Sequence, residues 1–262
     1  MCIKKIVILI FGFLIFYNQS QAMEFSNLSM EEFKIIIKKQ DQESDLNEIF
    51  SNVHCRINPT KYERILMTLL RDKNSSTKVF RNAAKKIGEL LVAKVVDCIE
   101  TVPVEIETPV AKCVGEVLNN QLDFVSIMRS GDALLDIFIE HFPKANISKI
   151  LVQRDEMTAK AIFKYMKLSS TLGQDHPVII TEPMIATGGT LSLVIGLLKE
   201  QGVRENNIIV ASICAAPEGI FQLVSQFPEI HIVVTALDEK LNEKKYIVPG
   251  LGDFGDRFFG TY

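Results

Sequence analysis

Two hydrophobic patterns alternate along the second half of the chain. Short apolar runs predict buried strands at residues 123–128, 147–153, 178–182, 207–213 and 230–236. Between these runs, apolar residues recur at helical spacing and predict helices at residues 132–141, 190–201 and 217–226. Strands and helices that alternate in this way imply an α/β fold, in which helices flank both faces of a mainly parallel, twisted sheet.

The first half of the chain has a weaker pattern. Ser29 and Glu32 form a capping box that opens a predicted helix, and a polar stretch at residues 38–45 follows as a loop or linker. We therefore expect an N-terminal helical extension over residues 23–60.

A longer helix is predicted after this extension. Ser75 or Ser76 supplies its N-cap. Its apolar stripe is formed by Val79, Phe80, Ala83, Ala84, Ile87, Leu90, Leu91 and Val95. After Pro103, a short strand is predicted at residues 104–107.

The first 22 residues have the pattern of a secretory signal peptide. Two lysines precede an apolar run at residues 6–17, and a Ser-Gln-Ala segment ends at Ala22. The apolar run is short for a membrane span, which needs about 20 residues. We expect cleavage after Ala22, while an uncleaved anchor and translation from Met23 stay open as alternatives.

Composition excludes few functions. The 262 residues suffice for one large domain or for a domain with an appendage. The net charge of −3 gives no support to a nucleic-acid partner, which favours a basic surface. Five cysteines lack CxxC spacing, so we expect mostly buried free thiols and neither a zinc site nor a disulfide framework.

The segment from Val178 to Glu200 carries the first candidate chemistry. A predicted strand ends at Glu182, a Thr-Gly-Gly-Thr loop spans residues 187–190, and a helix follows. The glycines let the backbone turn sharply, and the start of the helix presents free N–H groups, so the loop suits a phosphate. A plain strand-to-helix connection is the alternative. A carboxylate beside an anion site is costly unless it binds hydroxyls or a metal, and a ribose 5-phosphate offers Glu182 a diol.

Two arginines follow neighbouring strands of the predicted sheet. Arg129 follows the strand at residues 123–128, and Arg154 follows the strand at residues 147–153. The carboxyl ends of parallel strands meet at one edge, so both side chains are expected near Glu182. Guanidinium groups bind phosphate oxygens bidentately. Together these residues suggest a site for phosphoribosyl diphosphate (PRPP).

The last residues form the most unusual segment. Residues 235–262 contain several glycines, a proline and interleaved acids, and we predict neither helix nor strand there. An irregular loop of this kind presents main-chain N–H and C=O groups to a flat polar ligand such as uracil. A plain glycine-rich tail is the alternative.

Several segments together resemble uracil phosphoribosyltransferases, from about Leu66 to the end of the chain. They are Phe80-Arg81, Arg129-Ser-Gly131, Arg154-Asp-Glu156, Pro183 to Thr190, Ala215 to Gly219, and Asp238 to Thr261, which includes Tyr246-Ile-Val-Pro-Gly-Leu-Gly-Asp253. The resemblance implies a type I phosphoribosyltransferase domain over residues 61–262 with a C-terminal base-binding loop. It also implies transfer of ribose 5-phosphate from PRPP to uracil with Mg²⁺, giving UMP for pyrimidine salvage, together with a homo-oligomer and activation by GTP in some members.

The resemblance assigns the PRPP side of the site. Arg129 and Arg154 resemble the diphosphate ligands, and Arg129 is one of two residues given a catalytic role. Glu182 resembles the acid that meets the ribose hydroxyls. The remaining residues of the PRPP motif, of which the last four hold the 5-phosphate, are Pro183, Met184, Ile185, Ala186, Thr187, Gly188, Gly189 and Thr190.

The resemblance also assigns the base side and a lid. Ile247, Gly252, Asp253 and Phe254 resemble the uracil-binding segment. Asp253 is the second residue given a catalytic role, because it resembles the acid that reaches PRPP through Mg²⁺ and water, so no side chain is expected to bind the metal directly. Residues 156–169, especially Tyr165, Lys167 and Leu168, resemble a mobile loop that covers the site.

Three positions depart from the family pattern. Glu182 replaces an aspartate, Ser130 replaces an alanine, and Ser169 replaces the proline that ends the mobile loop. Because Glu182 is one methylene longer, we expect it to reach the diol only if the loop shifts. A catalytically weak or inactive homologue that binds PRPP or uracil and has a regulatory role is therefore the alternative function. A phosphoribosyltransferase for another base is a further alternative, against which the uracil-type loop argues.

The compartment is predicted in two ways. The N-terminal signal suggests export, whereas PRPP is an intracellular metabolite whose use suggests the cytoplasm. Three explanations remove the conflict: translation from Met23, delivery to a compartment that holds PRPP, or a changed role.

Overall fold

The computed structural model describes residues 29–30, 55–119, 121–154, 161–173 and 175–262. The predicted signal peptide and most of the predicted extension at residues 23–60 lie outside these ranges. Within them, no helix has the length and apolar character that crossing a membrane requires.

The described residues form a central eight-stranded sheet. Its order is β1–β10–β9–β7–β4–β5–β6, and β8 pairs with β9. All neighbours are parallel except β6, which runs antiparallel to β5 at the edge. The strands are β1 (Cys55–Arg56), β4 (Asp123–Met128), β5 (Asn146–Arg154), β6 (Ala161–Lys167), β7 (Val178–Thr181), β8 (Met184–Ile185), β9 (Ile208–Ala215) and β10 (His231–Leu237).

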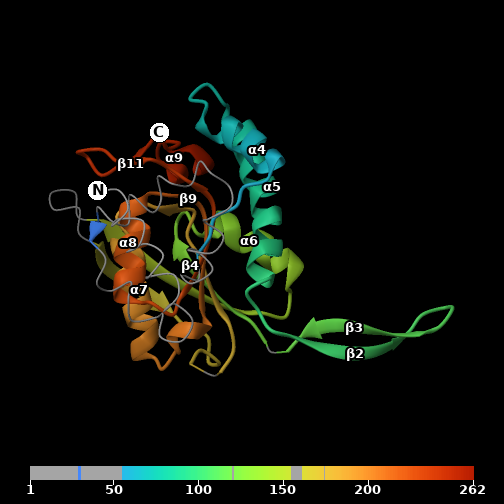
Figure 1. The fold of residues 1–262 in the computed structure, drawn as a ribbon. Coiled ribbons are helices and arrows are strands. Elements are labelled where there is room, and N and C mark those ends of the chain that lie inside the picture. Colours follow the sequence, from blue (N-terminus) through green and yellow to red (C-terminus); the bar gives the residue numbers. More distant parts are fainter. Residues whose placement is uncertain (1–28, 31–54, 120, 155–160, 174) are drawn as a thin grey trace, which may run out of the picture.

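Helices cover both faces of this sheet, as Figure 1 shows. One face carries α4 (Lys61–Arg71), α5 (Thr77–Val96) and α6 (Asp132–His141). The other face carries α7 (Gly189–Glu200) and α8 (Pro217–Gln226), and the 3-10 helix η4 (Glu205–Asn207) precedes β9. The predicted α/β fold with a mainly parallel, helix-flanked sheet is therefore confirmed.

The two faces of the sheet have separate hydrophobic cores. In β7, Ile179 packs with the core beneath α5 and α6, whereas Val178 and Ile180 pack with the core beneath α7 and α8. A strand buried on both faces reads as a continuous apolar run, which is why these strands were predictable. The predicted bounds of β4, α6 and α8 match the structure, and the other predicted strands and helices in this half differ by one or two residues at an end.

Helix α5 confirms the predicted cap and corrects the predicted stripe. The Ser76 hydroxyl accepts the N–H of Val79 at 3.4 Å, so Ser76 is the N-cap. Val79 itself is 37% exposed, while Gly88 and Val92 are buried. A side chain added at Gly88 would lie 2.3 Å from Ile137 of α6, so the glycine permits close helix packing.

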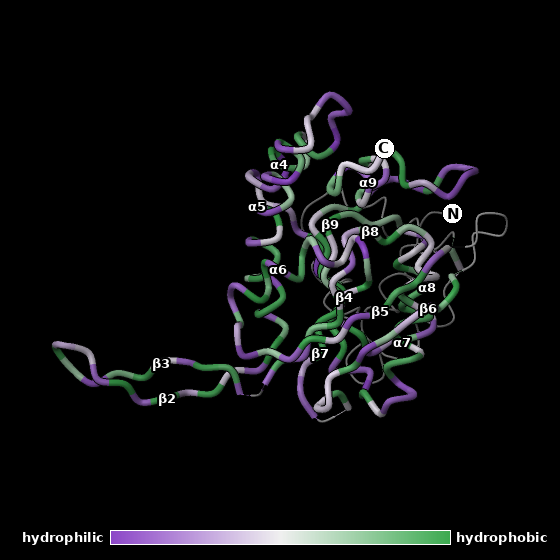
Figure 2. The backbone as a smooth tube through the Cα atoms, turned by 180° about the vertical axis from the view of Figure 1, so that it is seen from behind, coloured by the Kyte–Doolittle hydropathy of each residue, from purple (hydrophilic) through white to green (hydrophobic). Residues whose placement is uncertain are grey.

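A hairpin that the sequence pattern did not predict projects from the body. It consists of β2 (Thr101–Glu107) and β3 (Lys112–Leu118), and we call residues 101–118 the arm. The arm extends well beyond the sheet, and Figure 2 shows that it carries both hydrophobic and hydrophilic positions. The sequence pattern predicts a strand only at residues 104–107, after Pro103. In the structure Pro103 lies inside β2, opposite Glu116.

Three short elements correct the prediction for the C-terminal segment. β11 (Lys240–Leu241) pairs with β12 (Ile247–Val248), and α9 (Phe254–Phe259) follows. Asp253 caps α9 by accepting the N–H of Asp256 at 2.8 Å, and Gly260 ends the helix with φ of 76°.

The free cysteines only partly follow the expectation of buried thiols. Cys55 and Cys214 are buried and Cys98 is half-buried, but Cys113 on the arm is exposed. Burial raises the pKa of Cys55 to about 12.

Candidate functional site

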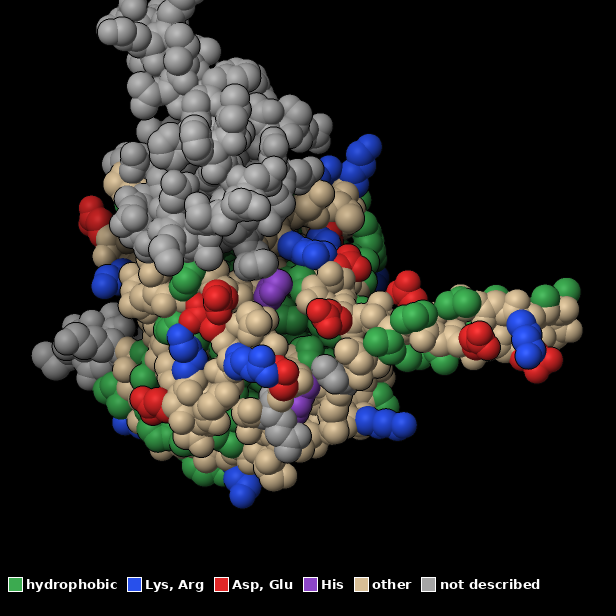
Figure 3. Space-filling model, turned by 60° about the horizontal axis from the view of Figure 1, so that its bottom comes forward, with side chains coloured by type: hydrophobic (Ala, Val, Ile, Leu, Met, Phe, Trp, Pro, Cys, Tyr) green, Lys and Arg blue, Asp and Glu red, His purple; other side chains and the backbone are tan. Residues whose placement is uncertain are grey.

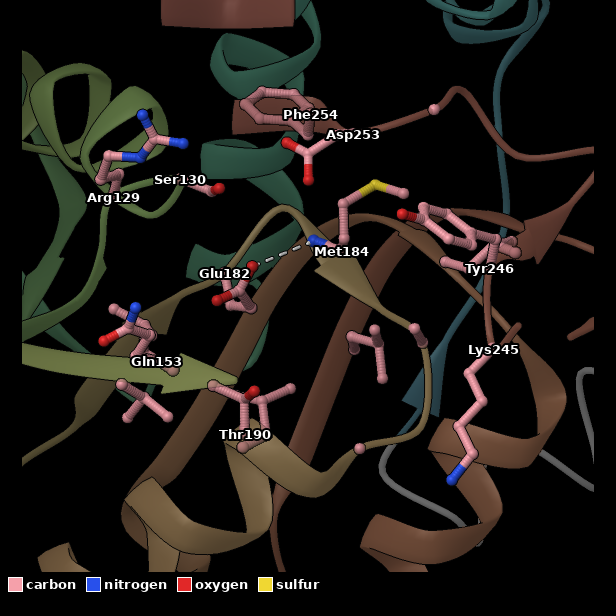
Figure 4. Close-up of a pocket in the computed structure, with 18 of the residues that line it drawn as sticks. Arg129, Ser130, Gln153, Glu182, Met184, Thr190, Lys245, Tyr246, Asp253 and Phe254 are labelled. Carbon is pink, nitrogen blue, oxygen red and sulfur yellow. Dashed lines mark hydrogen bonds between the residues drawn. The ribbon is translucent and has the colours of Figure 1, made fainter. Parts of the chain in front are cut away.

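A cavity of about 580 Å³ opens at the carboxyl ends of β4, β5 and β7. Its walls come from the ends of these strands, the start of α7, and the segment from β11 to α9, as Figure 4 shows. The predicted site residues that line it are Arg129, Glu182, Met184, Ile185, Ala186, Gly188, Thr190, Ile247, Gly252, Asp253 and Phe254. Pro183, Thr187 and Gly189 belong to the same loop but are not part of the cavity wall.

The loop before α7 has the tight geometry expected of an anion-binding turn. Gly188 adopts φ of 78°, and a side chain there would lie 2.8 Å from the carbonyl oxygen of Gly219. The N–H of Gly189 donates weakly to the Thr187 hydroxyl at 3.4 Å. Helix α7 begins at Gly189, so its first N–H groups lie beside the cavity at Thr190.

Glu182 lies near the middle of the cavity wall. Its backbone N–H donates to Ala211 at 3.2 Å, which continues the β7–β9 pairing by one residue. Its Oε1 accepts the N–H of Met184 at 3.4 Å. Figure 4 shows its carboxyl group between Asp253 on one side and Thr190 on the other.

Close packing between β4 and β7 brings Arg129 to the same edge as Glu182. A side chain at Gly131 would lie 2.3 Å from the carbonyl oxygen of Thr181, so only glycine fits at this turn. The Arg129 guanidinium points toward α9, where it donates to Asp256 Oδ1 at 3.1 Å and to Thr261 Oγ1 at 3.2 Å. Its carbon Cζ lies 5.8 Å from the centre of the Phe259 ring.

The other predicted arginine is placed only by its backbone. Arg154 is the last residue of β5, which pairs with β4, and its side chain lies outside the description. The two preceding residues, Val152 and Gln153, line the cavity.

The segment from Ile247 to Phe254 builds another part of the wall; we call it the base loop, because the family resemblance assigns it to uracil. Gly252 adopts φ of 81°. Asp253 uses Oδ1 to cap α9, and Figure 4 shows its carboxyl group directed into the space above Glu182. Phe254 is 2% exposed, and its ring stacks on Phe258 at 5.6 Å.

The sequence interpretation missed part of the wall. Asn242, Lys245 and Tyr246, from the turn between β11 and β12, also line the cavity. Asn242 shapes this turn, because its Oδ1 accepts the N–H of Tyr246 at 2.9 Å. Lys245 is the non-glycine residue with positive φ in the described part of the chain, at 63°, and such conformations concentrate at functional sites. Neither signal is visible in a hydrophobic pattern.

The charges of the described wall suit a ligand with both phosphates and hydroxyls. Glu182 and Asp253 are the carboxylates, and Arg129 and Lys245 are the cations. In the described ranges, no three His, Cys, Asp or Glu side chains gather as a metal-binding group.

The predicted mobile loop is largely a strand in the described residues. Residues 155–160 lie outside the description, and residues from Ala161 form β6, in which Tyr165 is 52% exposed. Ser169 binds Asp123 Oδ1 at 2.7 Å, at the start of β4, whereas Arg129 follows the end of that strand. Its departure from the family pattern therefore supports a half-buried polar contact at the opposite end of the sheet from the cavity.

The family model and the curated relatives name the same family. The family model for uracil phosphoribosyltransferase matches residues 57–261. A uracil phosphoribosyltransferase of Acholeplasma laidlawii is 40% identical over 195 residues, covering 74% of this chain and 92% of that protein. One of Lactococcus lactis subsp. cremoris is 41% identical over 196 residues, covering 74% and 92%. A solved structure of a protein from Aquifex aeolicus superposes with a TM-score of 0.70 at 30% identity, covering 79% of this chain and 98% of that one.

Proposed function

The chain belongs to the uracil phosphoribosyltransferase family, and we propose that it transfers ribose 5-phosphate from PRPP to uracil, giving UMP and diphosphate in pyrimidine salvage. The observation that supports this most strongly is the cavity of about 580 Å³. It joins a phosphate-type loop, a strand-end arginine, a carboxylate and an irregular base loop in one space. PRPP and uracil together present the groups that these features suit.

On the PRPP side, each group of the substrate has a matching residue. The turn at residues 187–190 and the start of α7 offer N–H groups and hydroxyls to the 5-phosphate. Glu182 offers a carboxylate to the ribose hydroxyls. Arg129 binds the diphosphate, and Arg154, at the end of the neighbouring strand, is proposed as its partner. For Arg129 this requires the guanidinium to leave its contact with Asp256.

On the base side, Ile247 and Gly252 offer main-chain groups to the polar edge of uracil, with Asp253 and Phe254 completing the wall. Recognition by fixed main-chain donors and acceptors rejects a base that presents the wrong order of groups, because buried polar atoms are then left unpaired. Asp253 faces the PRPP side as well, so it lies where both substrates meet.

The reaction breaks the bond between the anomeric carbon of PRPP and the diphosphate, and forms a bond from that carbon to N1 of uracil, which loses its proton. We infer that the residues act mainly by holding the two substrates in line and by stabilising the negative charge of the departing diphosphate. Arg129 supplies positive charge to that anion. A closed site also excludes water, which otherwise consumes PRPP.

The wall residues fit a Mg²⁺ ion that arrives with PRPP. Mg²⁺ is commonly held by one or two carboxylates together with substrate phosphates and water, and Glu182 and Asp253 face one another across the cavity. When bound, the ion adds positive charge to the diphosphate. Following the family resemblance, we propose that Asp253 contacts it through water, while its Oδ1 keeps the Asp256 N–H.

We further propose that the chain forms a homo-oligomer through the arm. A two-stranded hairpin alone is marginally stable in water. The arm nevertheless exposes Ile106 by 46%, Val110 by 94%, Val114 by 68% and Val117 by 47%. Figure 3 shows hydrophobic side chains exposed along the projecting arm. A second copy that covers them would stabilise the arm.

Two further proposals rest on the sequence and its family resemblance. Activation by GTP is tested by measuring UMP formation with and without the nucleotide. Export directed by the N-terminal segment, as opposed to a cytoplasmic chain beginning at Met23, is tested by sequencing the native N-terminus in fractionated cells.

The activity is tested by incubating the purified chain with PRPP, Mg²⁺ and radiolabelled uracil and following UMP. Cytosine and hypoxanthine serve as competing bases. Turnover of uracil in preference to both supports the proposal. Preferential use of another base, or uracil and PRPP binding in a calorimeter without turnover, contradicts it.

A further inference from the structure

Arg71, the last residue of α4, joins this helix to the base loop. Its Nη1 donates to Asp238 Oδ2 at 2.8 Å and to the carbonyl oxygen of Gly250 at 2.9 Å, and its Nη2 donates to Asp238 Oδ1. Asp238 Oδ2 in turn accepts the N–H of Gly250 at 2.7 Å. One ion pair therefore holds both polar backbone groups of Gly250.

This ion pair is largely shielded from water. The side chain of Asp238 is 1% exposed and that of Arg71 is 27% exposed. The hydrogen bonds that Arg71 donates to Asp238 hold the pKa of Arg71 above its ordinary value, although burial acts in the opposite direction. Removing one partner of a buried ion pair strongly destabilises the folded protein. The folded state therefore favours the arrangement in which Arg71 and Asp238 stay paired.

The position of Gly250 controls the shape of the base loop around it. Gly250 adopts φ of 64°, and a side chain there would lie 2.2 Å from the carbonyl oxygen of Ile247. The loop is thus folded back tightly on Ile247, and Gly252 follows two residues later. Ile247 and Gly252 are the residues whose main-chain groups are proposed to contact uracil. A shift of Gly250 would move both.

A second arginine connects the residue that follows Gly250 to the same part of α4. Buried Arg257 donates to the carbonyl oxygens of Leu251 at 2.7 Å and Asp72 at 2.6 Å, and also to that of Leu70. Its Cζ lies 4.5 Å from the centre of the Phe80 ring on α5. The C-terminal end of α4 therefore acts as a common support for the loop, although it lines no part of the cavity.

We propose that Arg71 and Asp238 are positioning residues for base recognition: they fix Gly250, and through it the main-chain groups that select uracil. This inference rests on the proposed function, because it takes the base loop as the uracil site. Selection between uracil and cytosine depends on a fixed order of main-chain donors and acceptors. It should therefore weaken when the backbone of the base loop moves. On the PRPP side only Asp253 belongs to the base loop, so that side depends less on the position of Gly250.

Arg71→Lys tests the proposal. Lysine keeps the positive charge, but a single ammonium group cannot replace the planar fork that binds both Asp238 oxygens and Gly250. We expect the KM for uracil to rise about tenfold or more, in line with the loss of a hydrogen bond to a charged group. The KM for PRPP should change less than about twofold, and the preference for uracil over cytosine should fall.

The matched control is Arg64→Lys, the same substitution on the same helix. Arg64 is exposed and donates to the carbonyl oxygen of Pro59 at 2.9 Å, away from the base loop. Its kinetic constants should match those of the unmodified chain. Asp238→Asn keeps the shape of the acceptor and removes its charge. If both residues act through Gly250, Arg71→Lys combined with Asp238→Asn raises the uracil KM no more than the stronger single change.

Circular dichroism and thermal unfolding establish that each variant is folded. A folded Arg71→Lys chain with an unchanged uracil KM overturns the proposal, and so does an equal rise for uracil and PRPP, which indicates a general loss of structure. An unmodified chain that forms no UMP contradicts the proposed function instead. In that case the uracil affinity of the unmodified and Arg71→Lys chains, measured by calorimetry, still decides whether the ion pair positions the base loop.

Discussion

Replacing Arg129 by alanine separates catalysis from folding at this site. The Arg129 side chain is 56% exposed, and its partner Asp256 is 39% exposed. Their contact of 3.1 Å is an exposed ion pair, and such pairs contribute about 0–1 kcal/mol to stability. The cation–ring contact with Phe259, at 5.8 Å, adds about 0.5–1 kcal/mol at an exposed position. The free energy of unfolding should therefore fall by no more than about 2 kcal/mol.

The expected effect on turnover is larger. A preorganised donor that stabilises a developing anion contributes about 10²–10³ in rate, or about 2.7–4 kcal/mol. If Arg129 stabilises the departing diphosphate, Arg129→Ala should lower kcat for UMP formation by a factor in that range. The chain should remain folded at the assay temperature.

The assay follows conversion of radiolabelled uracil, with urea unfolding measured on the same preparations. Asp256→Asn is the matched control, because it weakens the same ion pair while keeping the guanidinium. Its turnover should stay within a few-fold of normal. The reasoning fails if Arg129→Ala retains more than about a tenth of normal kcat, a loss far below that of an electrostatic clamp. It also fails if Asp256→Asn loses as much as Arg129→Ala.

Three further predictions concern other parts of the chain. Gly188→Ala places a side chain at φ of 78° and within 2.8 Å of the Gly219 carbonyl oxygen. It should lower the free energy of unfolding in urea by about 1–3 kcal/mol and raise the KM for PRPP. Gly196→Ala, on α7, where an added side chain meets nothing within 4 Å, is the control and should change neither quantity. Val114→Lys should shift the chain to a smaller species in sedimentation without loss of secondary structure, and an unchanged mass contradicts an oligomer formed through the arm. Burial raises the pKa of Cys55 from 9.0 to about 12. As the pH rises above 9, the thiol therefore loses its proton in the unfolded state before it does so in the folded state. The free energy of unfolding should then fall by up to about 1.4 kcal/mol per pH unit. Cys55→Ala should make that slope shallower, and an identical slope contradicts the assignment.

Burial explains which parts of the fold the sequence could predict. Strands such as β7 are covered on both faces, so their apolar runs stand out from the helices between them. The arm has no such signal, because both of its strands are exposed along most of their length. Helix α9 spans only six residues, which are too few to show helical periodicity in the sequence. Its two ends are determined by the N-cap at Asp253 and by Gly260.

The candidate site was predictable where local sequence determines geometry. The turn at residues 187–190 contains its own glycines, and strand ends place Arg129 and Glu182 at one edge. The direction of the Arg129 side chain depends instead on Asp256, 127 residues later in the chain. The support from Arg71 to the base loop likewise joins residues 179 positions apart. Contacts of this kind are absent from any local pattern.

The first turn of α9 links the two halves of the proposed site. Asp256 donates its N–H to Asp253 and accepts from the Arg129 guanidinium, so one residue contacts both proposed catalytic side chains. Its neighbour Arg257 is buried and anchored to the end of α4, which fixes this turn relative to the base loop. An exposed ion pair is weak, so the proposed diphosphate ligand would displace Asp256 from Arg129 at little cost, whereas the cap on Asp253 does not depend on that contact. Under the proposed function, this arrangement lets Arg129 move to PRPP while the base loop stays fixed.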